Sequence, residues 1–190
     1  ERQEFEQFEK TLRTIDEDAK ELDKRFNNSK NRSIITLPNG VKIPEPTKHK
    51  SGYNESETLI LLIYIIAYYP DLFTFKFLDY NTTKGIDFVI EKSSNPKYIE
   101  LKGTMLKKVN HSFRNIYKFI CYDIDLKSGE VVSDIEELDT VLQMNKDDKF
   151  ESYDEKFKSK KYTSYQLMPN TAVIQSMEIV VLKKILVDIL

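Results

Sequence analysis

The chain contains two neighbouring strand-like runs, Gly85-Ile86-Asp87-Phe88-Val89-Ile90 and Lys97-Tyr98-Ile99-Glu100-Leu101-Lys102. Between them, Ser93-Ser94-Asn95-Pro96 is typical of a turn, so the two runs are predicted to form an antiparallel hairpin. Side chains two residues apart in a strand point to the same face of the sheet. Glu100 and Lys102 are therefore predicted to share one face, and the hairpin can bring Asp87 alongside them.

A predicted helix precedes these strands. Asn54 can cap a helix that runs from residue 55 to residue 69 and stops at Pro70. The segment is apolar almost all round, so we predict that it lies buried. Another strand-like run, Phe75-Lys76-Phe77-Leu78-Asp79, follows the helix and extends the hairpin to a three-stranded antiparallel meander.

The remainder of the chain alternates between polar and apolar segments. A polar helical or loop segment at residues 110–115 leads into a predicted strand at 117–123. Residues 130–161 are charged and poorly periodic, which indicates an exposed insertion. Apolar character returns at 177–182 and 185–190, where we predict a final strand and a short helix.

The N-terminal segment has the pattern of a coiled coil. Over residues 1–27 apolar side chains recur at alternating spacings of three and four, at Phe5, Phe8, Leu12, Ile15, Ala19, Leu22 and Phe26. This stripe can pair with a second chain as a homodimer, pair with an upstream helix of the same polypeptide, or fold back onto the domain. Residues 28–50 are polar and turn-forming, which predicts a linker, so residues 51–190 form the main domain.

The composition excludes several classes of protein. The 190 residues include 29 Lys and Arg against 31 Asp and Glu, a net charge of -2, so no global positive field attracts nucleic acid. The longest apolar run, residues 59–69, is about half of the roughly 20 residues that a membrane-spanning helix needs, so no membrane is expected. A single cysteine, Cys121, favours a reducing, cytoplasmic setting. The chain opens at Glu1, which suggests a piece of a longer polypeptide.

Asp87 and Glu100 are two carboxylates that repel each other when they lie close together. Their proximity is favourable mainly when a divalent cation such as Mg²⁺ or Mn²⁺ lies between them. Such a metal polarises a phosphate and lowers the pKa of a bound water, while Lys102 can orient that water or stabilise the developing charge. The three side chains suit hydrolysis of a phosphodiester. The alternative is that Glu100 and Lys102 form only a solvated ion pair, worth at most about 1 kcal/mol.

The order of these segments is similar to that of a known family. Gly85-Ile86-Asp87 and then Ile99-Glu100-Leu101-Lys102, after a buried helix, resemble the core of the PD-(D/E)XK nuclease superfamily, the restriction-endonuclease-like fold. The resemblance covers residues 51–125 and implies an α/β fold with an αβββαβ core and a mixed central sheet. It also implies that Asp87 and Glu100 bind the metal, that Lys102 is catalytic and that DNA is cut. The family's leading proline is absent.

Members of this superfamily often add a glutamate from the first helix to the site. Glu55 or Glu57 is placed to play that part here. Glu57 also has a structural alternative, because Asn54 and Glu57 have the spacing of a capping box. The sequence leaves open which of the two glutamates joins the site.

Basic side chains follow the predicted Glu100 and Lys102 strand. Lys107, Lys108 and Arg114 form a small patch that suits contacts to phosphates. His111 lies in the same segment and either contacts phosphate, moves a proton near neutral pH, or is an ordinary surface residue. We predict that these four residues bind nucleic acid.

A narrower resemblance rests on Asn54-Glu55-Ser56-Glu57, Asn110-His111-Ser112-Phe113 and Phe119-Ile120-Cys121-Tyr122-Asp123. These segments look like the nuclease-like C-terminal module of bacterial proteins that carry a GHKL-type ATPase domain upstream. The resemblance therefore implies an ATPase domain in the same polypeptide. The rival hypothesis is a nuclease fold without catalysis that serves as a DNA-binding or dimerisation module.

Overall fold

The computed structural model describes residues 1–81, 87–90 and 97–190. The chain divides into two compact units, one of Glu1–Thr36 with Lys42–Glu45 and the other of Leu37–Val41 with Pro46–Leu190. The predicted turn at residues 93–96 and the Gly85-Ile86 pair lie outside the described residues.

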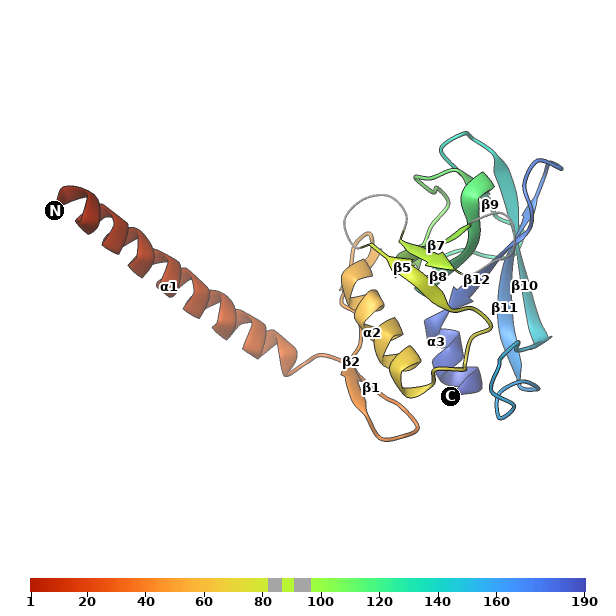
Figure 1. Cartoon of the computed structure of the whole chain (residues 1–190), viewed down its shortest axis with the longest axis horizontal. Coiled ribbons are helices and arrows are strands. Elements are labelled where there is room, and N and C mark those ends of the chain that lie inside the picture. The colour runs from red at the N-terminus through yellow and green to blue at the C-terminus, as the bar shows by residue number, and fades with distance from the viewer. Residues whose placement is uncertain (82–86, 91–96) are drawn as a thin grey trace. The chain divides into compact units, whose positions relative to one another are not determined.

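The first unit consists mainly of one long helix. Helix α1 (Arg2–Ser29) runs for 28 residues without a break, which confirms the N-terminal helix expected from the heptad pattern (Figure 1). Ion pairs one turn apart support it, such as Lys20 with Asp16 at 2.7 Å. Two short antiparallel strands, β1 (Ile34–Thr36) and β2 (Lys42–Pro44), complete the unit.

The second unit is built on a mixed sheet. Among the described residues, eight strands pair in the order β5-β6-β7-β8-β12-β11-β10-β9. Their bounds are β5 (Phe77–Tyr80), β6 (Phe88–Ile90), β7 (Tyr98–Met105), β8 (Ile116–Ile124), β9 (Val131–Ser133), β10 (Asp139–Lys149), β11 (Lys161–Pro169) and β12 (Met177–Val181). Strands β5, β6 and β7 are antiparallel, which confirms the predicted meander. Strand β8 is parallel to both β7 and β12, so the sheet is mixed, as predicted.

Helix α2 (Glu55–Tyr68) packs against β7 and β8 and confirms the predicted helix. Its N-terminus is capped by the Asn54 side chain, which accepts a hydrogen bond from the Glu57 backbone N–H at 2.9 Å. The prediction that the helix is buried all round is wrong. The side facing the sheet is buried, whereas Ile60 and Ile63 are 54% and 50% exposed. The apolar character of a helix does not show how many neighbours cover it.

The prediction of an exposed insertion at residues 130–161 is also wrong. This region contains β9 and β10, and β10 pairs along its length with β11. Thr140 and Leu142 point inward and are buried, while the charges concentrate beyond a bulge between Asn145 and Asp148. A strand with one solvated face can carry many charged residues and still belong to a sheet. The bulge interrupts the alternation of apolar and charged residues by which such a strand is recognised in a sequence.

The segment predicted as a linker contains structure of its own. Besides β1 and β2 it holds β3 (Lys48–His49), which pairs with β4 (Gly52–Tyr53) in an antiparallel hairpin. The hairpin is hydrogen-bonded to β7: the Tyr53 backbone N–H donates to Thr104 Oγ1 at 2.8 Å. Gly103 permits this approach: an added Cβ would lie 1.8 Å from the Tyr53 carbonyl oxygen.

The connection between β7 and β8 differs from the implied αβββαβ core. Its regular part among the described residues is a single 3-10 turn, η1 (Phe113–Asn115), where the resemblance implies a helix. Strand β12 and the helical C-terminus, α3 (Leu182–Lys184) with the π-helical turn η2 (Ile185–Ile189), confirm the predicted final strand and short helix. The fold is therefore mixed α/β without the complete element order of the nuclease core.

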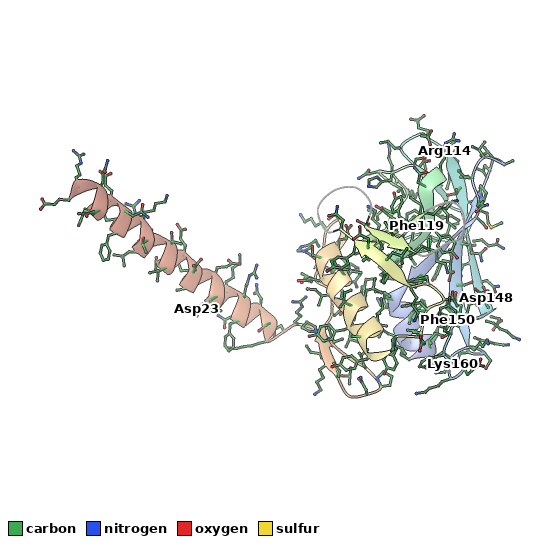
Figure 2. The ribbon with its side chains drawn as sticks, viewed as in Figure 1. Asp23, Arg114, Phe119, Asp148, Phe150 and Lys160 are labelled. Atoms are coloured by element: carbon green, nitrogen blue, oxygen red, sulfur yellow. The ribbon has the colours of Figure 1, made fainter. Side chains whose placement is uncertain are left out.

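One hydrophobic core cluster contains side chains of β8, β11 and β12. Phe119, labelled in Figure 2, is fully buried there. Cys121, Leu167 and Ile179 are buried in the same cluster. Cys121 therefore serves as a small core side chain, and burial raises the pKa of its thiol. Among the described residues, none of the helices combines the length and apolar character needed to cross a bilayer.

Candidate active site

Strand pairing brings the predicted catalytic side chains together at one place. Phe88 pairs with Ile99, which sets Asp87 beside Glu100 at the next position of the β6 and β7 ladder. The Leu101 backbone N–H donates to Asp87 Oδ2 at 2.7 Å and holds that carboxylate at the strand. Backbone pairing therefore positions the first carboxylate of the site.

Glu100 and Lys102 are in direct contact on the same face of β7. Lys102 Nζ lies 2.7 Å from Glu100 Oε1. Burial alone would lower the pKa of Lys102. The hydrogen bond from Lys102 to Glu100 and the charges of the nearby carboxylates have a larger combined effect, so the pKa of Lys102 is raised. Lys102 is therefore a permanent cation at neutral pH, with a quarter of its side chain exposed to solvent.

Glu100 is the most unusual residue of the site. It is 1% exposed, and its Oε2 is buried with no hydrogen-bond partner in the part of the chain that the structure describes. Burial raises its pKa, and the charge of Asp87 raises it further, against the opposing effect of Lys102. Burial likewise raises the pKa of Asp87. Two carboxyl groups thus lie in a poorly solvated place that disfavours two negative charges.

Two aromatic side chains border the carboxylates. His111 Nε2 lies 3.9 Å from Glu100 Oε1, so the structure brings this predicted residue to the site. The ring of Tyr98 meets the His111 ring edge-on, with centroids 6.3 Å apart. Burial and the charge of Glu100 raise the pKa of Tyr98, which keeps its hydroxyl protonated. Tyr98 was missed from the sequence, although its position two residues before Glu100 places it on the same face.

The two candidate glutamates of α2 lie in different surroundings. Glu55 lines a small pocket of about 60 Å³ together with Asp87 and Leu101. Burial raises the pKa of Glu55, and the charges of Lys102 and Asp87 act on it in opposite directions. Glu57 instead accepts a hydrogen bond from the Thr47 backbone N–H at 2.5 Å. The structure therefore brings Glu55 to the site and gives Glu57 a structural contact.

The predicted basic patch is largely neutralised by acidic side chains. Lys107 Nζ lies 3.1 Å from Glu130 Oε1, and Arg114 Nε lies 3.0 Å from Glu136 Oε2. Figure 2 shows Arg114 at the periphery of the unit. These pairings leave little of the patch's charge for phosphate groups. Lys108 lies beside Lys107, where its backbone bridges to Ser133.

A second group of basic side chains lies on the hairpin that is hydrogen-bonded to β7. Lys48, His49 and Lys50 are exposed on the β3–β4 hairpin and line a groove of about 290 Å³, whose far side carries Asp123, paired with Lys183, and Asp125. Thr104 contributes to the same groove, two residues from Lys102 on the same face of β7. Sequence reasoning passed over these residues because they fell in a predicted linker, although three consecutive basic side chains were a visible signal.

The donor set is compatible with a hard divalent cation. Mg²⁺ is commonly bound through one or two carboxylates with water in the remaining positions. Asp87 and Glu100 supply two carboxylates, and the unpartnered Oε2 of Glu100 is the atom that a cation would satisfy. The described residues contain no group of three or more His, Cys, Asp or Glu side chains arranged to hold a metal. The protein would therefore supply only part of the coordination shell.

No protein-family model, curated protein or solved structure matches this chain. The fold and the site together define a mixed α/β domain in which a buried carboxylate, Glu100, lies beside a half-buried one, Asp87, and a lysine.

Proposed function

We propose that the chain is a metal-dependent nuclease that hydrolyses phosphodiester bonds of DNA. One observation carries the proposal: Glu100 is a fully buried carboxylate with an unpartnered oxygen, beside a second carboxylate and a lysine. A buried carboxylate oxygen without a hydrogen-bond partner is costly, so its presence favours a functional role over a structural one. On the strength of the sequence motifs alone, we also propose that the domain works within a longer polypeptide that carries an ATPase domain.

Each side chain has a distinct part in the proposed mechanism. Asp87 and Glu100 would hold Mg²⁺ or Mn²⁺, which supplies a polarised phosphate and a water of lowered pKa. Lys102 is held protonated by Glu100 and stabilises negative charge that develops on the phosphate. His111 lies near enough to Glu100 to take up or release a proton at the edge of the site. Glu55 adds negative charge on the side of α2.

We expect Mn²⁺ to bind with release of protons, because the raised pKa values of Asp87 and Glu100 mean that a proton competes with the metal. Affinity should rise with pH until both groups are ionised. Calorimetric titration in two buffers of different ionisation enthalpy measures the protons released. DNA cleavage should require Mg²⁺ or Mn²⁺ and stop when a chelator is added.

The Asp87→Asn variant should lose both Mn²⁺ binding and cleavage. Asp79→Asn is the matched control, since Asp79 is exposed on the neighbouring strand β5 and should bind metal and cut DNA like the wild type. Wild-type protein that takes up no Mn²⁺ at any pH would contradict the nuclease proposal.

A catalytically inactive DNA-binding module is the second candidate. In this function the 2.7 Å contact between Lys102 and Glu100 is an ion pair that supports the fold. This function predicts DNA binding that neither a chelator nor the Glu100→Gln substitution affects. The two candidates therefore differ in whether the buried carboxylates matter to any measurable property besides stability.

Under the nuclease proposal, the β3–β4 hairpin binds the DNA backbone. The Lys48→Ala/Lys50→Ala double variant should weaken DNA binding and lower the slope of log affinity against log salt by about two, one for each phosphate that a lysine no longer neutralises. The Lys107→Ala/Lys108→Ala variant is the comparison, and should change the slope less because Lys107 is paired with Glu130. Titration of fluorescent DNA at several salt concentrations measures both. Equal slopes for wild type and the hairpin variant would contradict this assignment.

A further inference from the structure

Helix α1 carries a continuous apolar stripe that its own unit leaves uncovered. None of its residues is buried. Six large side chains of the stripe are between 49% and 68% exposed: Phe5, Phe8, Leu12, Ile15, Leu22 and Phe26. A stripe of this length on a soluble helix is typical of a surface that pairs with another helix.

We propose that α1 pairs with α1 of a second copy of this chain, in antiparallel orientation, so that each a or d residue n of the stripe between Phe5 and Leu22 faces residue 27 - n of the other helix. Antiparallel coiled coils bring a positions of one helix against d positions of the other. With Phe5, Leu12 and Ala19 at a and Phe8, Ile15 and Leu22 at d, this register pairs the first six positions of the stripe in complementary layers.

The sizes of the facing side chains favour this register. Phe8, one of the largest members of the stripe, faces Ala19 of the second helix, which is the smallest. Leu12 faces Ile15, and Phe5 faces Leu22. A parallel pair in register would place Ala19 against Ala19 and Phe8 against Phe8, leaving a gap in one layer and crowding in another.

The charges beside the stripe oppose a parallel pair. In a parallel coiled coil each g position faces the e position five residues later on the other helix. Glu4 would then face Glu9, and Asp18 would face Asp23. Both pairings bring like charges together, and each occurs twice in a symmetric dimer.

The same charges support the antiparallel pair. There, g positions face g positions and e positions face e positions of the other helix. Glu4 faces Arg25, and Arg2 faces Asp23, so opposite charges meet at both ends of the pair. Figure 2 shows the Asp23 side chain on the exposed surface of α1, where such an ion pair can form.

One flanking pairing of the antiparallel arrangement joins like charges, Glu9 and Asp16. Each of these acids has a cationic partner on its own helix. Arg13 lies 4.0 Å from Glu9, and Lys20 lies 2.7 Å from Asp16. The repulsion is therefore reduced before the helices meet, whereas the parallel arrangement has no attractive flanking pair to offset its repulsions.

The orientation fixes where the rest of each chain leaves the pair. The C-terminal ends of the two helices lie at opposite ends, and a 28-residue helix is about 42 Å long at 1.5 Å per residue. The remainder of each chain therefore continues from opposite ends of the paired helices rather than from one common end.

The orientation can be tested by measuring the dimer dissociation constant of charge-reversal variants of the full chain by sedimentation equilibrium, because the two orientations predict opposite changes. In the antiparallel pair the new arginine of Glu4→Arg faces Arg25, so dimerisation should weaken by roughly three- to tenfold. In a parallel pair the same arginine would face Glu9, and dimerisation would become stronger. Arg25→Glu should also weaken dimerisation, and the double variant Glu4→Arg/Arg25→Glu should restore it. Glu17→Arg, the same charge change on the outer face, is the matched control and should have little effect.

Disulfide trapping provides the second test. Phe8→Cys and Ala19→Cys chains should crosslink when mixed under oxidising conditions, and neither should crosslink when alone. Wild-type chain serves as the control for Cys121, which is buried and should not react. The proposal would be overturned by self-crosslinking of either variant alone or by a strengthened Glu4→Arg dimer. A wild-type chain that stays monomeric at every concentration would also overturn it, and would point to a helix of another segment as the partner.

Discussion

The Lys102→Met variant should cut DNA at least about 10²- to 10³-fold more slowly than the wild type, which is the usual cost of removing one group that stabilises transition-state charge. Lys102 lies 2.7 Å from Glu100 Oε1 and stays protonated, so the wild-type site always presents a cation to the substrate. Methionine keeps most of the length of the side chain and removes the charge together with the N–H donors that contact Glu100. Single-turnover cleavage with excess Mg²⁺ measures the chemical step.

The same variant should still bind Mn²⁺ at pH 8. Lys102 lowers the pKa of Glu100, so its loss strengthens the competing proton and shifts the onset of metal binding to higher pH. Lys107→Met is the matched control, because Lys107 pairs with Glu130 outside the site and should cut at the wild-type rate. Cleavage by Lys102→Met at an undiminished rate would show that the reaction does not use this cation.

The core of the site could be predicted because the rules behind it are local. Alternation along one strand places Glu100 and Lys102 together, and a short hairpin brings Asp87 beside them; neither step needs the rest of the fold. The same alternation along β7 also places Tyr98 on the face that carries Glu100 and Lys102. The separate surroundings of Glu55 and Glu57 required the structure, because both lie in the first turn of α2 and only the position of Thr47 distinguishes them.

The distant half of the sheet could not be predicted for physical reasons. Strands β10 and β11 have one solvated face, and their charges, together with the bulge between Asn145 and Asp148, conceal the alternation of an ordinary strand. The acidic partners of the predicted basic patch come from this half: Glu130 and Glu136 lie more than fifteen residues from their cations in sequence. Whether a surface cation is free depends on such long-range pairings.

The Glu100→Gln variant should lose Mn²⁺ binding and yet unfold at a higher temperature than the wild type in metal-free buffer at neutral pH. Glu100 is 1% exposed, and its Oε2 has no partner among the described residues. Burial raises the pKa of Glu100, so the folded state bears a cost for the ionised acid that an uncharged glutamine of the same shape does not bear. Because 1 kcal/mol corresponds to about 2–4 °C in a chain of this size, Tm should rise by several degrees.

The difference in Tm should depend on pH. Folding raises the pKa of Glu100 above its ordinary value of 4.5, so the folded state prefers the protonated acid. The wild type therefore has its full stability below that ordinary pKa and loses part of it as pH rises through the raised value. Glutamine does not titrate. The variant's advantage should be absent in acid and appear as the pH approaches neutrality, in thermal unfolding followed by circular dichroism.

In the presence of Mn²⁺ the wild type should have a higher Tm than the Glu100→Gln variant, the reverse of the order in metal-free buffer. The metal stabilises the wild type by binding the folded state and leaves Glu100→Gln unchanged. Glu151→Gln, at an exposed position, is the control and should match the wild type with and without metal. A purely structural ion pair between Glu100 and Lys102 leads to the opposite result, since removing one partner of a buried pair destabilises the fold. A lowered Tm together with no effect of Mn²⁺ on the wild type would therefore assign this carboxylate to stability rather than to catalysis.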